Sequence, residues 1–286
     1  RQFAMIQPIP RHRHGDPRRI MPDPDYHAPR HEVMMMVDGD AARALGDLAR
    51  RRWRHATGET IDPPPDAGGD PWPDHVPAQL TEVEVGIART EPDWNPRPMV
   101  TEIRKLTLAC IADARDTIYM ENQYFTSPLI ANELAKRLRE ADGPEVVLIS
   151  TEHSPSYFDQ MTMDRTRLAF IQTLTDADKH GRLQVYSPVT TLGRTIIVHA
   201  KLTIIDDTLL RIGSANINNR SMGFDTECDL SLEASGPGSA ANRAEIIVLR
   251  NKLLAQWRRF PGGSLGSALH EHAIVGGALE SRPNRG

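Results

Sequence analysis

Apolar residues recur along this chain with two different periods, and the alternation between them predicts its secondary structure. From Val83 onward, short apolar stretches alternate with longer stretches in which apolar residues fall three or four positions apart. Short apolar runs predict β-strands, and a spacing of three to four predicts amphipathic helices. A chain that alternates between strands and helices is typical of an α/β domain with helices packed on a sheet.

The expected elements of this region follow from those two patterns. Strands are expected at 83–88, 118–125, 146–150 and 183–186, and helices at 100–115, 128–140 and about 157–176. The strand at 146–150 is continuously apolar, which is typical of a strand buried on both faces.

The two ends of the chain are less regular. Residues 1–30 are rich in Pro, Arg, His and Asp without periodicity, and we expect an irregular loop there. Further along, 31–37 predicts a strand, 41–57 predicts a helix, and 59–80, with six prolines, predicts a surface loop. The tail at 261–286 is rich in Gly, Ser and Ala and is expected to be partly disordered.

Composition excludes some classes of protein. The chain has 34 Lys and Arg against 38 Asp and Glu, a net charge of −4, whereas a dedicated nucleic-acid binder usually has a basic excess. No apolar run reaches the ~20 residues of a membrane-spanning helix. Cys110 and Cys228 lack metal-ligand spacing, so we expect reduced thiols. We therefore expect no nucleic-acid partner and no transmembrane segment. The compartment stays open, with a cytoplasmic or peripheral membrane location favoured.

The stretch 195–233 carries the residues that point to chemistry. Period-two alternation places His199 and Lys201 on one face of a strand, and Asp206 begins the turn that follows. A second strand at 209–212 ends in Gly-Ser-Ala-Asn at 213–216, where the glycine lets the backbone bend. A third strand at 226–233 carries Glu227.

These residue types match the needs of phosphodiester cleavage. The imidazole of His199 is neutral near pH 7 and can react or carry a proton, and Lys201 offsets charge on phosphate oxygens. Ser214 and Asn216 supply hydroxyl and amide donors, and Glu227 can bind the other imidazole nitrogen and fix its tautomer. None of these roles requires a metal ion or a cofactor. The number of matching residues argues against a chance pattern.

Four further polar residues are candidates for lining this site. Glu121, Asn122 and Gln123 are unusually polar for a strand, and site lining and structural hydrogen bonding explain them equally well. Arg220 lies just past the motif and either meets a phosphate or forms a structural ion pair.

The pattern resembles the HKD motif of the phospholipase D superfamily, which reads HxKxxxxD followed by GSxN. Three other segments, 31–39, 119–127 and 218–227, are similar to segments of its two-motif phospholipases, and the resemblance covers roughly residues 5–258. It implies a phospholipase D-like α/β/α sandwich with a mixed β-sheet. Two similar halves of such a fold each bring one motif to a shared site.

The resemblance also implies a role for each matching residue. One histidine of such a site forms a covalent phosphohistidine, and the other, the part implied for His199, protonates the leaving alcohol. Lys201 and Asn216 would hold phosphate oxygens with support from Ser214, and Glu227 would orient a histidine. Asp206 belongs to the catalytic motif as a support for the site rather than as a reacting group.

The chain departs from the two-motif pattern because it holds a single HKD motif. None of the other ten histidines has a lysine two positions later. Since residue 1 is Arg rather than Met, we expect 1–82 to be a remnant of the N-terminal half, with its motif upstream of Arg1. Residues 83–260 would then be the C-terminal catalytic half. The alternative is that two copies pair and each supplies His199. A missing N-terminal half or a second copy is therefore the expected protein partner.

The implied activity is phospholipase D hydrolysis at a membrane surface. The expected substrate is a phosphatidylcholine-like glycerophospholipid, which gives phosphatidic acid and a free alcohol. Three alternatives stay open: a cardiolipin-synthase-like phosphatidyltransferase, a nuclease of the same superfamily, which the acidic balance disfavours, and an incomplete half-site that is inactive alone.

Overall fold

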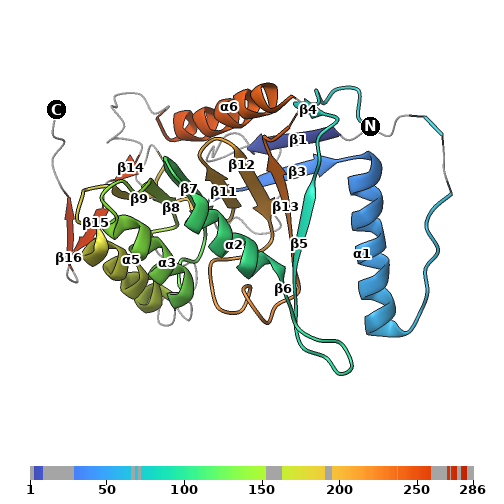
Figure 1. Cartoon of the computed structure of the whole chain (residues 1–286), viewed down its shortest axis with the longest axis horizontal. Coiled ribbons are helices and arrows are strands. Elements are labelled where there is room, and N and C mark those ends of the chain that lie inside the picture. The colour runs from blue at the N-terminus through green and yellow to red at the C-terminus, as the bar shows by residue number, and fades with distance from the viewer. Residues whose placement is uncertain are drawn as a thin grey trace, which may run out of the picture.

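A nine-stranded mixed sheet forms the centre of the protein (Figure 1). The computed structural model describes residues 3–8, 29–65, 68–69, 72–152, 163–190, 195–236, 238–258, 269–270, 272–275 and 278–281. In spatial order the strands are β14 (Leu269–His270), β9 (Leu183–Pro188), β8 (Glu145–Ile149), β7 (Thr117–Asn122), β11 (Lys201–Ile205), β12 (Leu209–Gly213), β13 (Glu227–Glu233), β5 (Gly86–Glu91) and β6 (Val100–Thr101).

Strand direction changes within this sheet. β7, β8 and β9 are parallel, whereas β7 with β11 and every pair from β11 to β6 are antiparallel. Parallel neighbours need a crossover connection, and the helices α3 (Pro128–Arg139) and α5 (Arg165–Ala177) lie in these connections. Antiparallel neighbours need only a turn, and residues 206–208 join β11 to β12. The expected α/β fold with a mixed sheet is therefore confirmed.

Helices cover both faces of the sheet. On one face, α2 (Glu102–Asp113), α3 and α5 bury apolar side chains such as Leu134 against Met120 of β7. On the other face, α6 (Ser239–Arg258) buries Leu249 in a second core with Leu210 and Tyr119. Neighbouring residues of β7 thus enter opposite cores, as the pleat of a strand requires. No helix in the described ranges is both long and apolar enough to span a bilayer.

The N-terminal part adds a separate small sheet and a helix. Strands β3 (Val33–Val37), β1 (Phe3–Pro8) and β4 (Leu80–Thr81) pair in that order, and α1 (Gly39–Thr57) follows β3 (Figure 1). The expectation of a loop throughout 1–30 was wrong at 3–8, where β1 pairs antiparallel with β3. The Pro and charged residues that dominate this segment concealed a short, largely apolar run. Residues 9–28 lie outside the described part.

Most other expected elements are present. α1, α2, α3, β8 and β9 begin and end within two residues of their expected bounds. The strand expected at 83–88 is displaced to Gly86–Glu91, because its pairing with β13 sets its register. The helix expected from about 157 is described only from 163 onward.

The tail was expected to be partly disordered. Its described residues form β14 and a hairpin of β15 (His272–Val275) and β16 (Ala278–Ser281). Residues 261–268, 271, 276–277 and 282–286 lie outside the described part.

Candidate active site

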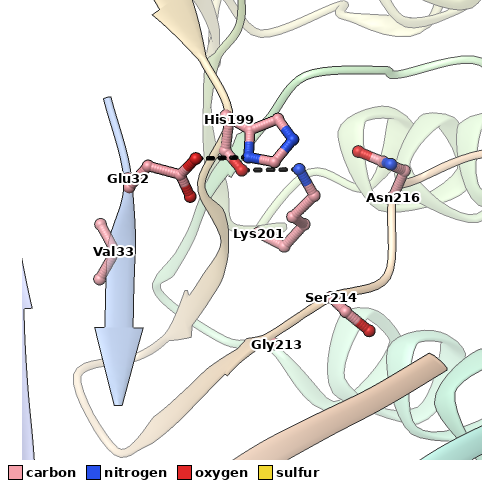
Figure 2. A pocket seen from close by; sticks show the side chains of 7 residues that line it. All are labelled: Glu32, Val33, His199, Lys201, Gly213, Ser214 and Asn216. Carbon is pink, nitrogen blue, oxygen red and sulfur yellow. Dashed lines mark hydrogen bonds and ion pairs between the residues drawn. The ribbon is translucent and has the colours of Figure 1, made fainter. Parts of the chain in front are cut away.

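The candidate site lies at one edge of the central sheet, where three antiparallel neighbours begin or end. β11 begins at Lys201, β12 ends at Gly213 and β13 begins at Glu227. Because neighbouring strands run in opposite directions, these three ends meet at the same edge. A cavity of about 330 Å³ opens there, lined by Glu32, Val33, His199, Lys201, Gly213, Ser214 and Asn216 (Figure 2).

His199 lies between β10 (Ile197–Val198) and β11 and is oriented by a carboxylate. Its Nδ1 is 2.7 Å from Oε1 of Glu32, an ion-pair distance at which the two groups are not aligned as a hydrogen bond. The nearby carboxylate favours a proton on Nδ1, which leaves the lone pair of a neutral ring on Nε2. Figure 2 shows the second ring nitrogen on the side away from Glu32, toward Asn216. Burial, followed by the nearby Lys201 ammonium, lowers the pKa of His199 below its ordinary value. The free protein therefore favours the neutral ring with Nε2 available.

Lys201 supplies the cation of the cavity. Its Nζ donates to the backbone oxygen of His199 at 2.6 Å (Figure 2). Burial lowers the pKa of Lys201 to about 8, and the carboxylates of Glu32 and Glu227 partly oppose that shift. At pH 7 the side chain is still mainly an ammonium ion, and a bound phosphate would stabilise this form.

The turn after β12 is built around the carboxylate of Asp229. Its Oδ1 accepts the backbone N–H of Ser214 at 3.0 Å and of Ala215 at 3.1 Å. A Cβ at position 213 would lie only 2.0 Å from this oxygen, so glycine is the residue that fits. The turn carries Ser214 and Asn216 past the cavity.

The side chains of Ser214 and Asn216 differ in the hydrogen bonds that they make within the protein. The Oγ of Ser214 donates to Oε2 of Glu227 at 2.5 Å and accepts the N–H of Cys228 at 3.0 Å. In contrast, Oδ1 of Asn216 is buried without a hydrogen-bond partner among the described residues. An amide that the protein does not engage can rotate to present its N–H groups to a ligand oxygen. Asn216 is the better placed of the two to contact a phosphate.

Asp206 lies at the opposite end of β11 and does not line the cavity. Its carboxylate accepts the backbone N–H groups of Arg115, Asp116 and Thr117, each at 2.8 Å. These bonds hold the chain that enters β7. Asp206 was expected to support the site rather than to react, and its carboxylate is saturated by backbone donors at a distance from the cavity. Its place among the catalytic residues stays a prediction.

The carboxylate that contacts His199 is not the one expected from the sequence. Glu227 was expected to bind a histidine, but its contact is with Ser214, and burial raises the pKa of Glu227. Glu32 takes the place at Nδ1 of His199. The sequence reasoning missed Glu32 because it lies in a distant segment with no motif. One feature of the sequence could have indicated Glu32: it is a charged residue inside the apolar strand expected at 31–37.

Asn122 and Gln123 are close to the site but do not line the cavity. Oδ1 of Asn122 accepts the N–H of Tyr124 at 3.1 Å and of Ile217 at 3.2 Å. Gln123 donates to the hydroxyl of Tyr124 at 3.1 Å. Of the two interpretations that the sequence left open, structural hydrogen bonding describes both residues. Asn122 ties β7 to the chain just past Asn216.

Arg220 and Glu121 also bind protein groups rather than the cavity. Nε and one terminal nitrogen of Arg220 donate to Oδ1 of Asp225 at 3.0 and 2.7 Å, at an exposed position. Glu121 is fully buried and contacts His31 and Tyr119. The structure thus favours the structural alternative for both.

The described residues contain no metal-binding arrangement. No group of three or more His, Cys, Asp or Glu side chains among them is placed to hold a metal ion. Cys110 and Cys228 are free thiols, as expected, and burial raises the pKa of each.

Known proteins with similar sequences share this region. Residues 107–245 match the family model described as "Cardiolipin synthase, PLD-like domain". The chain is 25% identical over 237 residues to cardiolipin synthase A of Serratia proteamaculans, covering 80% of this chain and 43% of that protein. It is 27% identical over 172 residues to phospholipase D alpha 1 of Spuriopimpinella brachycarpa, covering 60% of this chain and 16% of that protein.

A solved structure is also similar. Nuc from Salmonella typhimurium, described as a phospholipase D family member, aligns at 18% identity with a TM-score of 0.45, over 62% of this chain and 95% of that one.

The chain spans less than half the length of the two curated relatives. The matched region includes the HKD residues His199, Lys201 and Asp206, together with Ser214 and Asn216. Together, the motif and the sequence matches show that this chain is similar to proteins of the phospholipase D superfamily.

Proposed function

We propose that this protein cleaves the phosphodiester bond of glycerophospholipids and releases phosphatidic acid and the head-group alcohol. One observation carries the proposal: a single cavity presents an oriented histidine, a lysine ammonium and an uncommitted amide. His199 can carry a proton, Lys201 can offset negative charge, and Asn216 can donate a hydrogen bond. An anionic phosphodiester in its transition state needs these three contributions.

In the proposed reaction His199 acts as acid and then as base. A second histidine attacks phosphorus, and the bond from phosphorus to the head-group oxygen breaks as the nitrogen–phosphorus bond forms. His199 takes up a proton on Nε2 as the anionic substrate binds, with its positive charge stabilised by Glu32, and gives this proton to the departing oxygen. His199 then takes a proton from water, whose oxygen bonds to phosphorus as the nitrogen–phosphorus bond breaks. Lys201 and Asn216 hold the non-bridging oxygens through both steps.

The second histidine is proposed to come from another half-site. Within the described part of the chain, His199 is the histidine that lines the cavity. A missing N-terminal half or a second copy of this chain would bring the other, and Glu227 would orient it as Glu32 orients His199. On this proposal the chain alone binds phosphate and turns over little or no lipid.

Two exposed aromatic residues support a substrate held in a membrane surface. Trp94, in the loop from β5 to β6, is 68% exposed, and Phe224, in the loop before β13, is 67% exposed. Both loops leave the sheet at the edge where the cavity opens, and the loop before β13 contacts the end of β5, since Thr90 of β5 donates to the backbone oxygen of Ser221 at 2.7 Å. Large apolar side chains exposed on loops at the same edge of the sheet as a pocket suit contact with lipid.

Phosphatidyl transfer is the second candidate function. The matched family model and one of the relatives are named for cardiolipin synthase, which favours it. The same residues would act, but the hydroxyl of a lipid alcohol would replace water in the second step. The two candidates thus differ in the acceptor and share the first half of the reaction.

Product analysis separates these two functions. A form of the protein that includes a second half-site is incubated with vesicles of phosphatidylcholine or of phosphatidylglycerol, and the phosphorus-containing products are identified by ³¹P NMR. Hydrolysis gives phosphatidic acid from both lipids, whereas transfer between two phosphatidylglycerol molecules gives cardiolipin and glycerol. Formation of neither product, or undiminished product formation by His199→Ala, would contradict the proposal.

A further inference from the structure

Three buried side chains that contact one another have no part in the proposed reaction. Nε2 of His31 is 2.6 Å from Oε2 of Glu121, and both side chains are fully buried. The hydroxyl of Tyr119 donates to the other oxygen of the same carboxylate. Tyr119 and Glu121 belong to β7, whereas His31 belongs to the distant strand β2 (Arg30–His31). Because desolvating ionisable groups is unfavourable, this arrangement requires an explanation.

The backbone of His31 holds the backbone of the catalytic segment. β2 pairs in parallel with β10, with His31 opposite Val198. The carbonyl oxygen of His31 accepts the N–H of His199 at 2.8 Å and the N–H of Ala200 at 3.1 Å. A displacement of His31 would therefore move the main chain at His199.

The residue that follows His31 orients the catalytic ring. Glu32 places its Oε1 2.7 Å from Nδ1 of His199. The chain then continues into β3, which belongs to the three-stranded sheet and not to the central sheet. Two links that join this segment to the catalytic part of the protein are the pairing of β2 with β10 and the contact between His31 and Glu121.

We infer that Glu121 is a positioning residue: it holds His31 in the interior, with Tyr119 as its second partner, and thereby fixes Glu32 against Nδ1 of His199. The consequence is a single ring orientation, with Nε2 directed to the cavity. The effect on turnover rests on the proposed function of His199. The effect on the ring itself does not, so the two can be tested separately.

The ring effect is tested by ¹⁵N NMR of histidine-labelled protein, with the His199 signals assigned by their loss in His199→Gln. In the wild-type chain at neutral pH, the shifts are expected to report one neutral tautomer with the proton on Nδ1. Glu121→Gln keeps the side-chain shape and removes the charge, and it is expected to shift the His199 signals toward a mixture of tautomers. Unchanged His199 signals in a folded Glu121→Gln protein would overturn the inference.

The effect on turnover is tested by a double-mutant cycle in a form that turns over phospholipid. Glu121→Gln is expected to lower kcat by about 10- to 100-fold, with little change in KM because Lys201 and Asn216 stay in place. Glu32→Gln is expected to lower kcat at least as much. If Glu121 acts through Glu32, the double variant is no slower than Glu32→Gln alone. If the double variant instead lost kcat by the product of the two single-variant factors, Glu121 and Glu32 would act independently, and the inference would be refuted.

Thr175→Val is the matched control. The hydroxyl of Thr175, which is half-buried, also donates a hydrogen bond, to the carbonyl oxygen of Ile171 at 3.0 Å, and it does not line the cavity. Its loss is expected to leave the His199 signals unchanged.

A milder variant covers the case in which Glu121→Gln does not fold. Tyr119→Phe removes one hydrogen bond to Glu121 and keeps the ring, so a smaller shift of the His199 signals in the same direction is expected. Identical signals in Tyr119→Phe and wild type would then count against the inference. If a variant shifts the His199 signals but does not change turnover, the inferred role of Glu121 in positioning the His199 ring still stands. The proposed catalytic role of His199 would then be contradicted.

Discussion

The two ends of β11 carry parts of one sequence motif but use their polar groups in opposite ways. At the cavity end, the second ring nitrogen of His199 lies on the side away from Glu32, Asn216 has an unpartnered amide oxygen, and the pKa of Lys201 is lowered to about 8. At the other end, both oxygens of Asp206 accept backbone N–H groups, three in all. One end keeps its groups free for a ligand, and the other saturates them.

This difference separates the chemical part of the motif from its structural part. A group that is to bind a ligand must be left without protein partners, and burial without partners lowers stability. A carboxylate saturated by backbone donors stabilises the sheet but has little left to offer a substrate. The strand between the two ends spans roughly 16 Å at about 3.3 Å per residue. We therefore expect variants at the two ends to have opposite effects on activity and on stability.

The largest expected effect is on activity, at His199. His199→Ala should lower kcat/KM by about 10³-fold or more, because no other proton carrier replaces the imidazole. Its free energy of unfolding should change by less than about 1 kcal/mol. Initial rates on phospholipid vesicles, in a form of the protein that includes a second half-site, and urea denaturation measure the two quantities. His180→Ala, at an exposed position, is the control and should behave like wild type. A His199→Ala protein that is unfolded, or that is folded and fully active, would remove the contrast between the two ends.

The next effect concerns Lys201 and the pH dependence of kcat/KM. The ammonium form exists below the pKa of about 8 and is lost above it, so kcat/KM should fall as the pH rises through about 8. Lys201→Met should lower kcat/KM by about 100-fold at pH 7. Lys201→Arg should retain part of the activity and lose the decline near pH 8, because a guanidinium stays charged. A decline near pH 8 that persists in Lys201→Arg would assign it to another group.

At the other end, the expected effect of Asp206 is on stability. Asp206→Ala removes the acceptor of three backbone N–H groups and should lower the free energy of unfolding by about 2–4 kcal/mol. Turnover per folded molecule should stay within about threefold of wild type. Asp206→Asn keeps an acceptor oxygen and tolerates the positive φ of 52° at this position, so its loss of stability should be smaller. A stable but inactive Asp206→Ala protein would show that Asp206 takes part in the chemistry.

The smallest expected effect is at Ser214, which contacts Glu227 rather than the cavity centre. Ser214→Ala should lower kcat/KM by about three- to tenfold, the range expected for one lost hydrogen bond. The hydroxyl lowers the pKa of Glu227 and burial raises it, so removing the hydroxyl should raise this pKa further. If the ionised form of Glu227 is required, the acidic limb of the pH profile should move to higher pH. If Ser214→Ala lowered kcat/KM more than Lys201→Met does, Ser214 rather than Lys201 would be the more important residue for the reaction, which contradicts this account.

Local patterns predicted much of the fold and of the site. Alternation in the stretch around His199 and Lys201 indicated that both side chains face one way, and both line the cavity. Gly213 indicated a bend, and the turn there requires a residue without a Cβ. These predictions succeeded because the physics behind them acts over a few neighbouring residues. The α/β class was predictable for the same reason.

What the sequence did not predict depends on contacts between distant segments. Glu32 reaches His199 only because β2 pairs with β10, and no local period records that pairing. Glu121 was an unexplained polar residue in a strand until its contact with His31 was known. β1 was missed because its strand character depends on pairing with β3. In each case the tertiary partner decides the role of the residue.

The central claim is that the His199 end of β11 is a phosphate site. The most direct measurement is a titration of this chain with inorganic phosphate, followed by the ¹⁵N shifts of His199 and by calorimetry. Saturable binding that shifts the His199 signals is expected for wild type and Asp206→Asn, and its loss is expected for Lys201→Met. Absence of saturable binding to the wild-type chain, or equal binding by Lys201→Met, would contradict the claim.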